Sequence, residues 1–391
     1  MLIAGEASGD LLAAELVSAL GAPSSILHPP SSPVFFGAGG AKMAAAGVEL
    51  AFDMTEHAVI GISDVLKNYF KFRRLFHQLL ALAIERKPDV LIGVDFGGFN
   101  LRFGHAVKAY ARNNPFAKWN PKIVQFVSPQ VWASRPGRAK LLEADYDLLL
   151  SIFPFEKDWY AERAPKLRVE FVGHPMVGRF VPEGRVTRVP EMEELGTRGV
   201  RPSGILILPG SRKSELKRHL PVMLGALKMI REKLPSAKAK MVLPDEVLKE
   251  LAGKMPALQS NVEIQIGDLP RALAGADVAI ASTGTVTMEC AFFGVPAVTL
   301  YKTSWFNYEI ARRIATVKWA TMPNILADEE VYPEFIQSVA TAENISCAAL
   351  ELLQNEPRRT KIKSQLEKIV SSLGEPGASR RAAAAILSLF N

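Results

Sequence analysis

The chain has 391 residues, of which 48% are hydrophobic, and its 47 Lys and Arg against 40 Asp and Glu give a formal net charge of +7. This length predicts two domains of comparable size, and the composition excludes a largely disordered chain. The sequence contains no run of about 18 apolar residues, so it predicts no membrane-spanning helix. The positive charge favours anionic partners, which include phosphates, acidic lipids and nucleic acid.

The first residues carry neither the basic flank nor the long apolar stretch of a signal peptide. Cys290 and Cys347 lie far apart and form no metal-binding or disulfide pattern. The sequence therefore predicts a chain that stays inside the cell, in a reducing compartment.

Short apolar runs alternate with helical patterns along the whole chain, which is typical of helices packed around parallel sheets. The first half predicts strands at 2–4, 34–36, 90–94, 123–127, 148–153 and 169–172. The second half predicts strands at 205–208, 240–243, 262–266, 278–281 and 297–300. We expect two open α/β domains, at residues 1–177 and 204–343. A Pro-, Gly- and charge-rich linker at 178–203 separates them, and C-terminal helices at 344–391 pack back on the first domain.

Two strand ends in the second half have residues that suit a nucleotide diphosphate. The first strand is followed by Gly210, Ser211 and Arg212, which offer close backbone approach, a hydroxyl and a planar cation. The fourth is followed by Ser282, Thr283, Gly284 and Thr285, with Glu289 one helical turn further on to accept ribose hydroxyls. A helix cap is the alternative interpretation of each segment taken alone.

The first half offers acidic groups at corresponding positions. Asp95 follows an apolar strand and precedes two glycines, which suits a general base for an acceptor hydroxyl, although a helix-capping aspartate is the alternative. The opening turn contains Glu6, Ser8 and Asp10 and does not fit the dinucleotide pattern GxGxxG, so it suits sugar hydroxyls better than phosphate.

No pattern predicts a metal or another cofactor. Asp145-Tyr146-Asp147 has the spacing of a manganese-binding DxD, but it directly precedes a predicted strand, where aspartate is common in turns. The six histidines lack zinc-binding spacing.

Residues 65–84 mix aromatic and basic side chains, which suits a helix lying in an anionic membrane surface. A partly buried helix with a solvated basic edge is the alternative. The membrane interpretation assigns the surface to Tyr69, Phe70, Lys71, Phe72, Arg73 and Arg74.

Several motifs, in order along nearly the whole chain, resemble those of the lipid-A-disaccharide synthase family. They are IAGEASGD (3–10), VSPQVWASRPGR (127–138), FPFEK (153–157), FVGHP (171–175), LPGSRKSE (208–215), ASTGTVTMEC (281–290), MPNILA (322–327) and VYPEFIQ (331–337). The resemblance implies a GT-B fold, with two Rossmann-like domains facing a cleft. It also implies an inverting, metal-independent transfer of 2,3-diacylglucosamine from its UDP derivative to 2,3-diacylglucosamine 1-phosphate, in lipid A biosynthesis.

The resemblance also assigns roles to residues. Asp95 matches the catalytic aspartate and Arg212 the essential arginine. Ser211, Gly284, Thr285, Glu289 and Asn324 match positions that face the nucleotide, and we extend this set to Gly210, Ser282 and Thr283. The expected acceptor contacts are Glu6, Ser8, Asn100, Ser128, Trp132 and Arg135. The implied location is the cytoplasmic face of the inner membrane as a peripheral protein, with a homodimer as the expected assembly and no nucleic acid partner.

Two departures from the family pattern affect the acceptor side. Relatives usually carry Pro-Asp-Phe-Asn where this chain has Gly97-Gly98-Phe99-Asn100, so a second carboxylate near Asp95 is missing. Ser134 replaces the second tryptophan of a VWAW segment. In addition, the chain begins within the first strand. A UDP-N-acetylglucosamine 2-epimerase and a non-catalytic membrane-bound protein that binds nucleotide sugars or lipids are the alternative functions.

Overall fold

The structure, a computed structural model, describes residues 1–22, 33–54, 69–180, 204–255 and 262–390. The chain divides into two compact units. Unit 1 comprises Met1–Glu183 and Leu373–Asn391, and unit 2 comprises Gly184–Ser372.

The described part of unit 1 contains a seven-stranded parallel sheet in the order β3-β2-β1-β4-β5-β6-β7. Its central strands are buried on both faces, which explains their continuous apolar runs. The order of its first six strands is that of a Rossmann fold. The strands are β1 (Leu2–Ala4), β2 (Phe36–Gly39), β3 (Glu49–Asp53), β4 (Val90–Val94), β5 (Lys122–Phe126), β6 (Leu148–Ser151) and β7 (Val169–Phe171).

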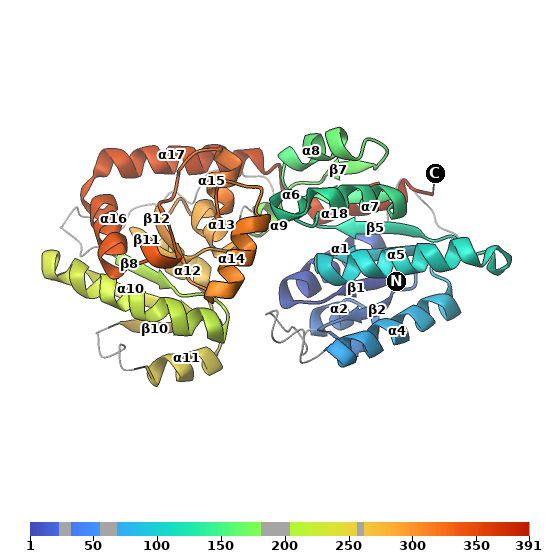
Figure 1. Cartoon of the computed structure of the whole chain (residues 1–391), viewed down its shortest axis with the longest axis horizontal. Helices are drawn as coiled ribbons and strands as arrows, with labels where there is room; N and C mark the ends of the chain where they lie inside the picture. The colour runs from blue at the N-terminus through green and yellow to red at the C-terminus, as the bar shows by residue number, and fades with distance from the viewer. Residues whose placement is uncertain (23–32, 55–68, 181–203, 256–261, 391) are drawn as a thin grey trace. The chain divides into compact units, whose positions relative to one another are not determined.

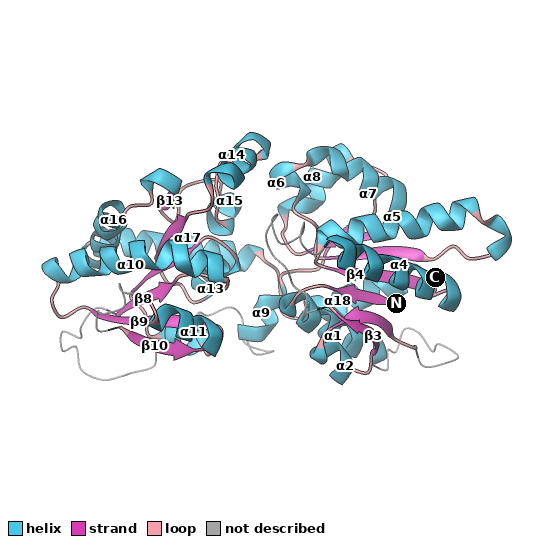
Figure 2. Ribbon diagram, turned by 60° about the horizontal axis from the view of Figure 1, so that its bottom comes forward, coloured by secondary structure: helices cyan, strands magenta, loops and turns pink. Residues whose placement is uncertain are grey.

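Helices cover both faces of this sheet (Figures 1 and 2). One face carries α4 (Tyr69–Arg86), α5 (Gly97–Asn113), α7 (Ala139–Asp145) and α8 (Phe155–Arg163), and the core there includes Leu79, Phe103 and Tyr160. The other face carries α1 (Ala7–Gly21), α2 (Ala41–Ala45), α9 (Pro175–Phe180) and α18 (Ala378–Leu387). The shorter elements are η2 (Pro115–Ala117), α6 (Val131–Ser134) and η3 (Pro136–Arg138).

The described part of unit 2 repeats the Rossmann order in a six-stranded parallel sheet, β10-β9-β8-β11-β12-β13. The strands are β8 (Gly204–Leu208), β9 (Lys238–Leu243), β10 (Glu263–Ile266), β11 (Val278–Ser282), β12 (Ala297–Tyr301) and β13 (Glu334–Ile336). The helices are α10 (Lys213–Lys233), α11 (Glu246–Gly253), α12 (Leu269–Ala274), α13 (Thr285–Phe292), α14 (Trp305–Ile314), α15 (Met322–Ala327), the short η5 (Gln337–Val339), α16 (Ala342–Gln354) and α17 (Glu356–Ser372).

The C-terminal helices do not form one group, which corrects the expected segment 344–391. Helix α16 packs on α10, and α17 packs on α13, so both belong to unit 2. Of the three, α18 is the one that packs on unit 1, against α1. Most of the expected linker, residues 181–203, lies outside the described residues, and its first residues belong to α9.

Within the described ranges, no helix combines the length and the apolar character needed to cross a bilayer.

Candidate active site

Each sheet has one point where the strand order reverses, and both predicted groups of site residues lie there. In a doubly wound sheet, ligands bind at the carboxyl ends of the two strands that flank this point. The flanking strands are β8 and β11 in unit 2, and β1 and β4 in unit 1. The topology therefore brings the separate motifs of each half together at one sheet edge.

The turn after β8 presents hydrogen-bond donors to an anion. Gly210 has a φ of +112°, which favours glycine, and a Cβ there would collide with the carboxylate of Glu215. That carboxylate accepts the Ser211 backbone N–H at 3.1 Å and a guanidinium N–H of Arg212 at 3.2 Å. The Nε of Arg212 is buried and has no hydrogen-bond partner in the described structure. These donors already hold one anionic group, the Glu215 carboxylate.

His219, which no sequence pattern singles out, fixes the backbone of this turn. Its buried ring lies 2.9 Å from the Pro209 carbonyl oxygen through Nδ1, and its Nε2 accepts the Lys302 backbone N–H at 3.0 Å. Nδ1 therefore donates and the ring is neutral, in agreement with burial lowering its pKa. The histidine joins the ends of β8 and β12.

The turn after β11 has the open backbone expected of an anion site. Gly284 is the N-cap of α13 with a φ of +149°, and no heavy atom lies within 4 Å of where its Cβ would be. Gly284 and Thr285 are exposed, whereas Thr283 and Glu289 are half-buried. Ser282 is only 3% exposed as the last residue of β11, so it is less accessible than predicted.

Asn324 corrects another prediction, because its amide does not face the site. The side chain is fully buried, donates to the Tyr332 carbonyl and the Glu334 carboxylate, and accepts the Val331 and Tyr332 backbone N–H groups, all at 2.8–2.9 Å. All four hydrogen bonds that a carboxamide can make are thus internal. Asn324 orients the loop before β13 and has no group left for a nucleotide.

In unit 1, Asp95 sits in a strained turn at the end of β4. Asp95 and Phe96 have φ values of +51° and +47°, a conformation that costs a non-glycine residue about 1–3 kcal/mol. Burial raises the pKa of the Asp95 carboxyl, and a hydrogen bond from the Phe96 backbone N–H lowers it by less. Strain of this kind gathers at functional sites, and a raised pKa suits a general base.

Two buried side-chain amides hydrogen-bond to the backbone of Asp95. The carbonyl oxygen of Asp95 accepts the side-chain amides of Asn100 at 2.8 Å and Gln125 at 2.9 Å. Asn100, predicted to bind the acceptor, is 1% exposed and instead supports the turn that carries Asp95. The oxygen atoms of both amides are buried without a partner among the described residues.

The opening turn lies against the same edge. A Cβ at Gly9 would lie 3.7 Å from the Cβ of Asp95, so the start of α1 approaches the predicted base closely. Ser8 is exposed and Glu6 is half-buried, as ligand-facing residues can be. Asp10 has a different role, because its buried carboxylate accepts three backbone N–H groups at the start of α2.

Ser128 and Trp132, two more of the predicted acceptor contacts, direct their polar atoms inward. The Trp132 indole donates to Glu156 at 2.9 Å, and the Ser128 hydroxyl donates to the Tyr160 hydroxyl at 3.2 Å. Glu156 is 1% exposed, and burial raises its pKa to about 7 although hydrogen bonds from the Trp132 indole and the Phe153 backbone N–H oppose this. Of this segment's three predicted contacts, Arg135 alone is exposed.

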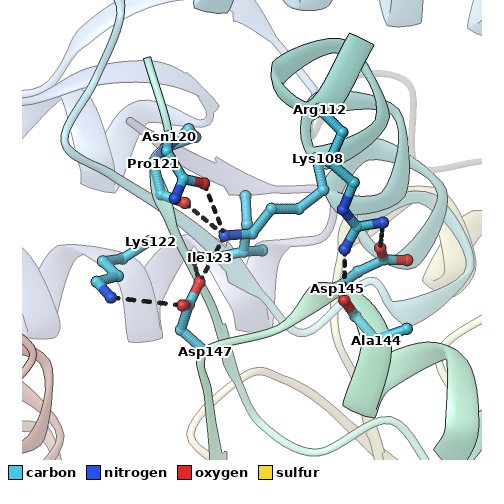
Figure 3. Close-up of polar contacts among 9 residues, drawn as sticks. All are labelled: Lys108, Arg112, Asn120, Pro121, Lys122, Ile123, Ala144, Asp145 and Asp147. Carbon is cyan, nitrogen blue, oxygen red and sulfur yellow. Dashed lines mark hydrogen bonds and ion pairs between the residues drawn. The ribbon is translucent and has the colours of Figure 1, made fainter. Parts of the chain in front are cut away.

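Figure 3 shows that both carboxylates of the DxD-like segment, Asp145 and Asp147, bind groups of the protein itself. Asp147 accepts the Ile123 backbone N–H at 2.8 Å and pairs with Lys108 at 2.9 Å. Asp145 pairs with Arg112 at 3.1 Å. Because this segment precedes β6, it lies at the amino ends of the strands, opposite the edge that carries Asp95.

Helix α4 combines both interpretations of its sequence. Leu75 and Leu79 are buried, and Phe76 packs edge-on against Phe99 and Phe103, as a core helix requires. Near its start, Phe70 is 79% exposed, Arg73 and Arg74 are exposed, and Phe72 packs on the core. Among the side chains that the structure describes, the exposed ones near the start of α4 are thus Phe70 and two arginines. The described structure does not cover the side chains of Tyr69 and Lys71.

The sequence model of the family described as lipid-A-disaccharide synthetase matches residues 1–388. The chain belongs to this family. It is 36% identical to the lipid-A-disaccharide synthase of Trichlorobacter lovleyi, over all of this chain and 97% of that protein. It is 34% identical to that of Myxococcus xanthus with the same coverage.

Solved structures place the synthetase family fold among the GT-B proteins. A calicheamicin glycosyltransferase matches with a TM-score of 0.57 at 15% identity, covering 99% of this chain and 96% of that protein. UDP-GlcNAc 2-epimerase from Neisseria meningitidis, bound to UDP-GlcNAc, matches with a TM-score of 0.55 at 11% identity, covering 89% and 88%. The epimerase likeness extends only to the fold, whereas family membership identifies the chain as a glycosyltransferase of lipid A biosynthesis.

Proposed function

We propose that unit 2 binds UDP-2,3-diacylglucosamine at the carboxyl ends of β8 and β11. The observation that carries this is the group of donors at Ser211 and Arg212, which already hold the carboxylate of Glu215 and include an unpaired, buried Nε. The exposed start of α13 at Gly284 and Thr285 adds a second set of backbone N–H groups at the same edge. A diphosphate would take the place of the carboxylate on these donors.

Asp95 of unit 1 is proposed as the general base of a single displacement. Its carboxylate takes the proton of the acceptor hydroxyl while that oxygen bonds to the anomeric carbon of the donor. The bond from that carbon to the diphosphate breaks, and UDP leaves with the electron pair. Attack from the opposite side inverts the anomeric centre, and Arg212 with the helix N-termini stabilises the charge on UDP.

The proposed acceptor is 2,3-diacylglucosamine 1-phosphate. Glu6 and Ser8 support its placement, because both lie in the turn whose backbone packs beside Asp95. The acyl chains of both substrates require access to lipid. We therefore propose peripheral binding to the cytoplasmic face of the inner membrane through Phe70, Arg73 and Arg74. The homodimer stays a prediction, which sedimentation equilibrium can test.

The test is release of UDP from UDP-2,3-diacylglucosamine with and without the acceptor. We expect release to depend on the acceptor, Asp95→Asn to lower kcat by about 10²–10⁴-fold with an unchanged Kd for UDP, and Arg212→Ala to weaken UDP binding as well as turnover. Lys217→Ala, an exposed cation on the same helix as the Arg212 turn, is the control and should behave as wild type. Equal UDP release without acceptor, or normal turnover in Asp95→Asn, would overturn the assignment.

A further inference from the structure

Three arginines from two neighbouring segments of unit 1 gather near one another. Arg102 lies on α5, whereas Arg135 and Arg138 lie at the start and end of the turn containing η3. Helix α7, which follows η3 directly, packs on α5. The charges of Arg135 and Arg102 both act on Arg138, whose pKa is lowered by burial first and by these two cations second. Arg138 therefore lies near both other cations, on the two segments that the packing of α7 on α5 brings together.

Within the described ranges, no carboxylate compensates these charges. None of the three side chains takes part in an ion pair or hydrogen bond there, whereas Arg112 on the same helix pairs with Asp145. Gly98 lies four residues before Arg102 on the same helix face, is exposed and has open space around it. The position from which an acid would best pair with Arg102 thus carries no side chain.

The cluster lies at the sheet edge that carries the predicted base. Arg102 is five residues beyond Gly97, which is about 7.5 Å along the helix axis. A Cβ at Gly97 would lie 2.8 Å from the Cβ of Pro129, so the segment that leads to Arg135 packs against the start of α5. Both segments of the cluster therefore begin near the turn that carries Asp95.

We propose that Arg102, Arg135 and Arg138 form a binding subsite for a phosphate monoester, namely the phosphate of the acceptor sugar. Guanidinium groups bind phosphate through paired, charge-assisted hydrogen bonds, and a dianion offsets the repulsion among three cations. Arg102 and Arg135 are exposed and Arg138 is half-buried, so the side chains are accessible. The assignment rests on the proposed function for the identity of the acceptor, and it adds the residues that select a phosphorylated one.

The experiment measures equilibrium binding of two probes to the full chain. The probes are 2,3-diacylglucosamine 1-phosphate and the same compound without the phosphate, so the result does not depend on turnover. We expect the wild type to bind the phosphorylated probe at least tenfold more tightly, as two or more charge-assisted hydrogen bonds allow. Combined replacement of the three arginines by Gln should bring the two affinities to within about threefold. The exposed Arg163→Gln on α8 is the control and should keep the preference.

Equal binding of both probes by the wild type, or an unchanged preference in the triple variant, would overturn the subsite.

Two further results distinguish the subsite from a lipid-headgroup site and from the catalytic assignment. If the triple variant loses binding to vesicles of phosphatidylglycerol while it keeps the preference between the two probes, the arginines bind lipid headgroups and the proposal is wrong. If the preference holds but no acceptor-dependent UDP release occurs, the subsite stands and the proposed function fails.

Discussion

Replacing Glu156 by Gln should change how the stability of unit 1 depends on pH. Glu156 is fully enclosed, and burial raises its pKa to about 7 from an ordinary value of 4.5. Between these two values the folded protein keeps the proton and the unfolded chain does not. Stability therefore falls as the pH rises through this window, by about 3 kcal/mol in total, since each pH unit contributes about 1.4 kcal/mol. The Glu156→Gln side chain carries no titrating proton, so this variant should show none of the loss.

The absolute stability of the variant is less informative than its pH dependence. One carboxylate oxygen of Glu156 accepts the Trp132 indole N–H at 2.9 Å, and the other accepts the Phe153 backbone N–H at 3.3 Å. A glutamine amide would turn its NH₂ group toward one of these donors, which costs about 1–3 kcal/mol at every pH. This constant cost does not alter the slope.

Urea-dependent hydrogen exchange of peptides from β6 and α8 is the suitable assay, because two units can unfold separately. From pH 5 to pH 8 we expect the wild type to lose about 2–3 kcal/mol relative to Glu156→Gln. The control is Glu162→Gln, which removes an exposed carboxylate from the same helix and should follow the wild type. Parallel curves for wild type and Glu156→Gln would refute the argument that burial holds a proton on this side chain.

Three other predictions concern the remaining groups. As the pH is lowered, kcat/KM should fall with a midpoint above 3.8, the ordinary pKa of aspartate. Burial raises the pKa of Asp95, and only its ionised form can accept a proton. A midpoint at or below 3.8 would exclude Asp95 as the base. Asn324→Ala should lower the stability of unit 2 by about 2–4 kcal/mol, since it leaves buried donors and acceptors unpaired, and a thermal melt with an unchanged Tm would contradict this. Arg73→Glu with Arg74→Glu should abolish sedimentation with phosphatidylglycerol vesicles but leave UDP binding intact, and unchanged sedimentation would count against that surface.

The central strands were predictable because parallel strands buried on both faces need continuous apolar runs. The edge strands β3 and β13 were missed for the same reason. Each is exposed or only partly buried along its length, and each includes a glutamate, so neither shows such a run. The edge strands β7 and β10 also include a glutamate and yet were predicted, so an edge position makes a strand harder to recognise but does not by itself hide it.

The sequence indicated which strand ends carry the candidate residues, but it did not indicate the direction of their side chains. Asp95 and Arg212 occupy the predicted turns, because topology alone brings those turns to the sheet edge. Asn324 and Trp132 also occupy predicted segments, yet their polar atoms point to internal partners. Which acceptor a buried amide or indole finds depends on contacts between distant segments, and no local pattern encodes them.

The two units share one strand order but carry different turns at the point where it reverses. In unit 2, the turns contain glycines with positive φ and a group of donors at Ser211 and Arg212, which suits the proposed anion site. At the switch point of unit 1, Asp95 and Phe96 take the left-handed backbone region without being glycine, and the turn carries a carboxylate whose burial keeps it basic. Glu215 fits the same logic, because it supplies a negative charge to the donors of unit 2 that a diphosphate can replace. If the nucleotide binds as proposed, it exchanges one anion for another, and the Arg212 guanidinium keeps a negative partner before and after binding.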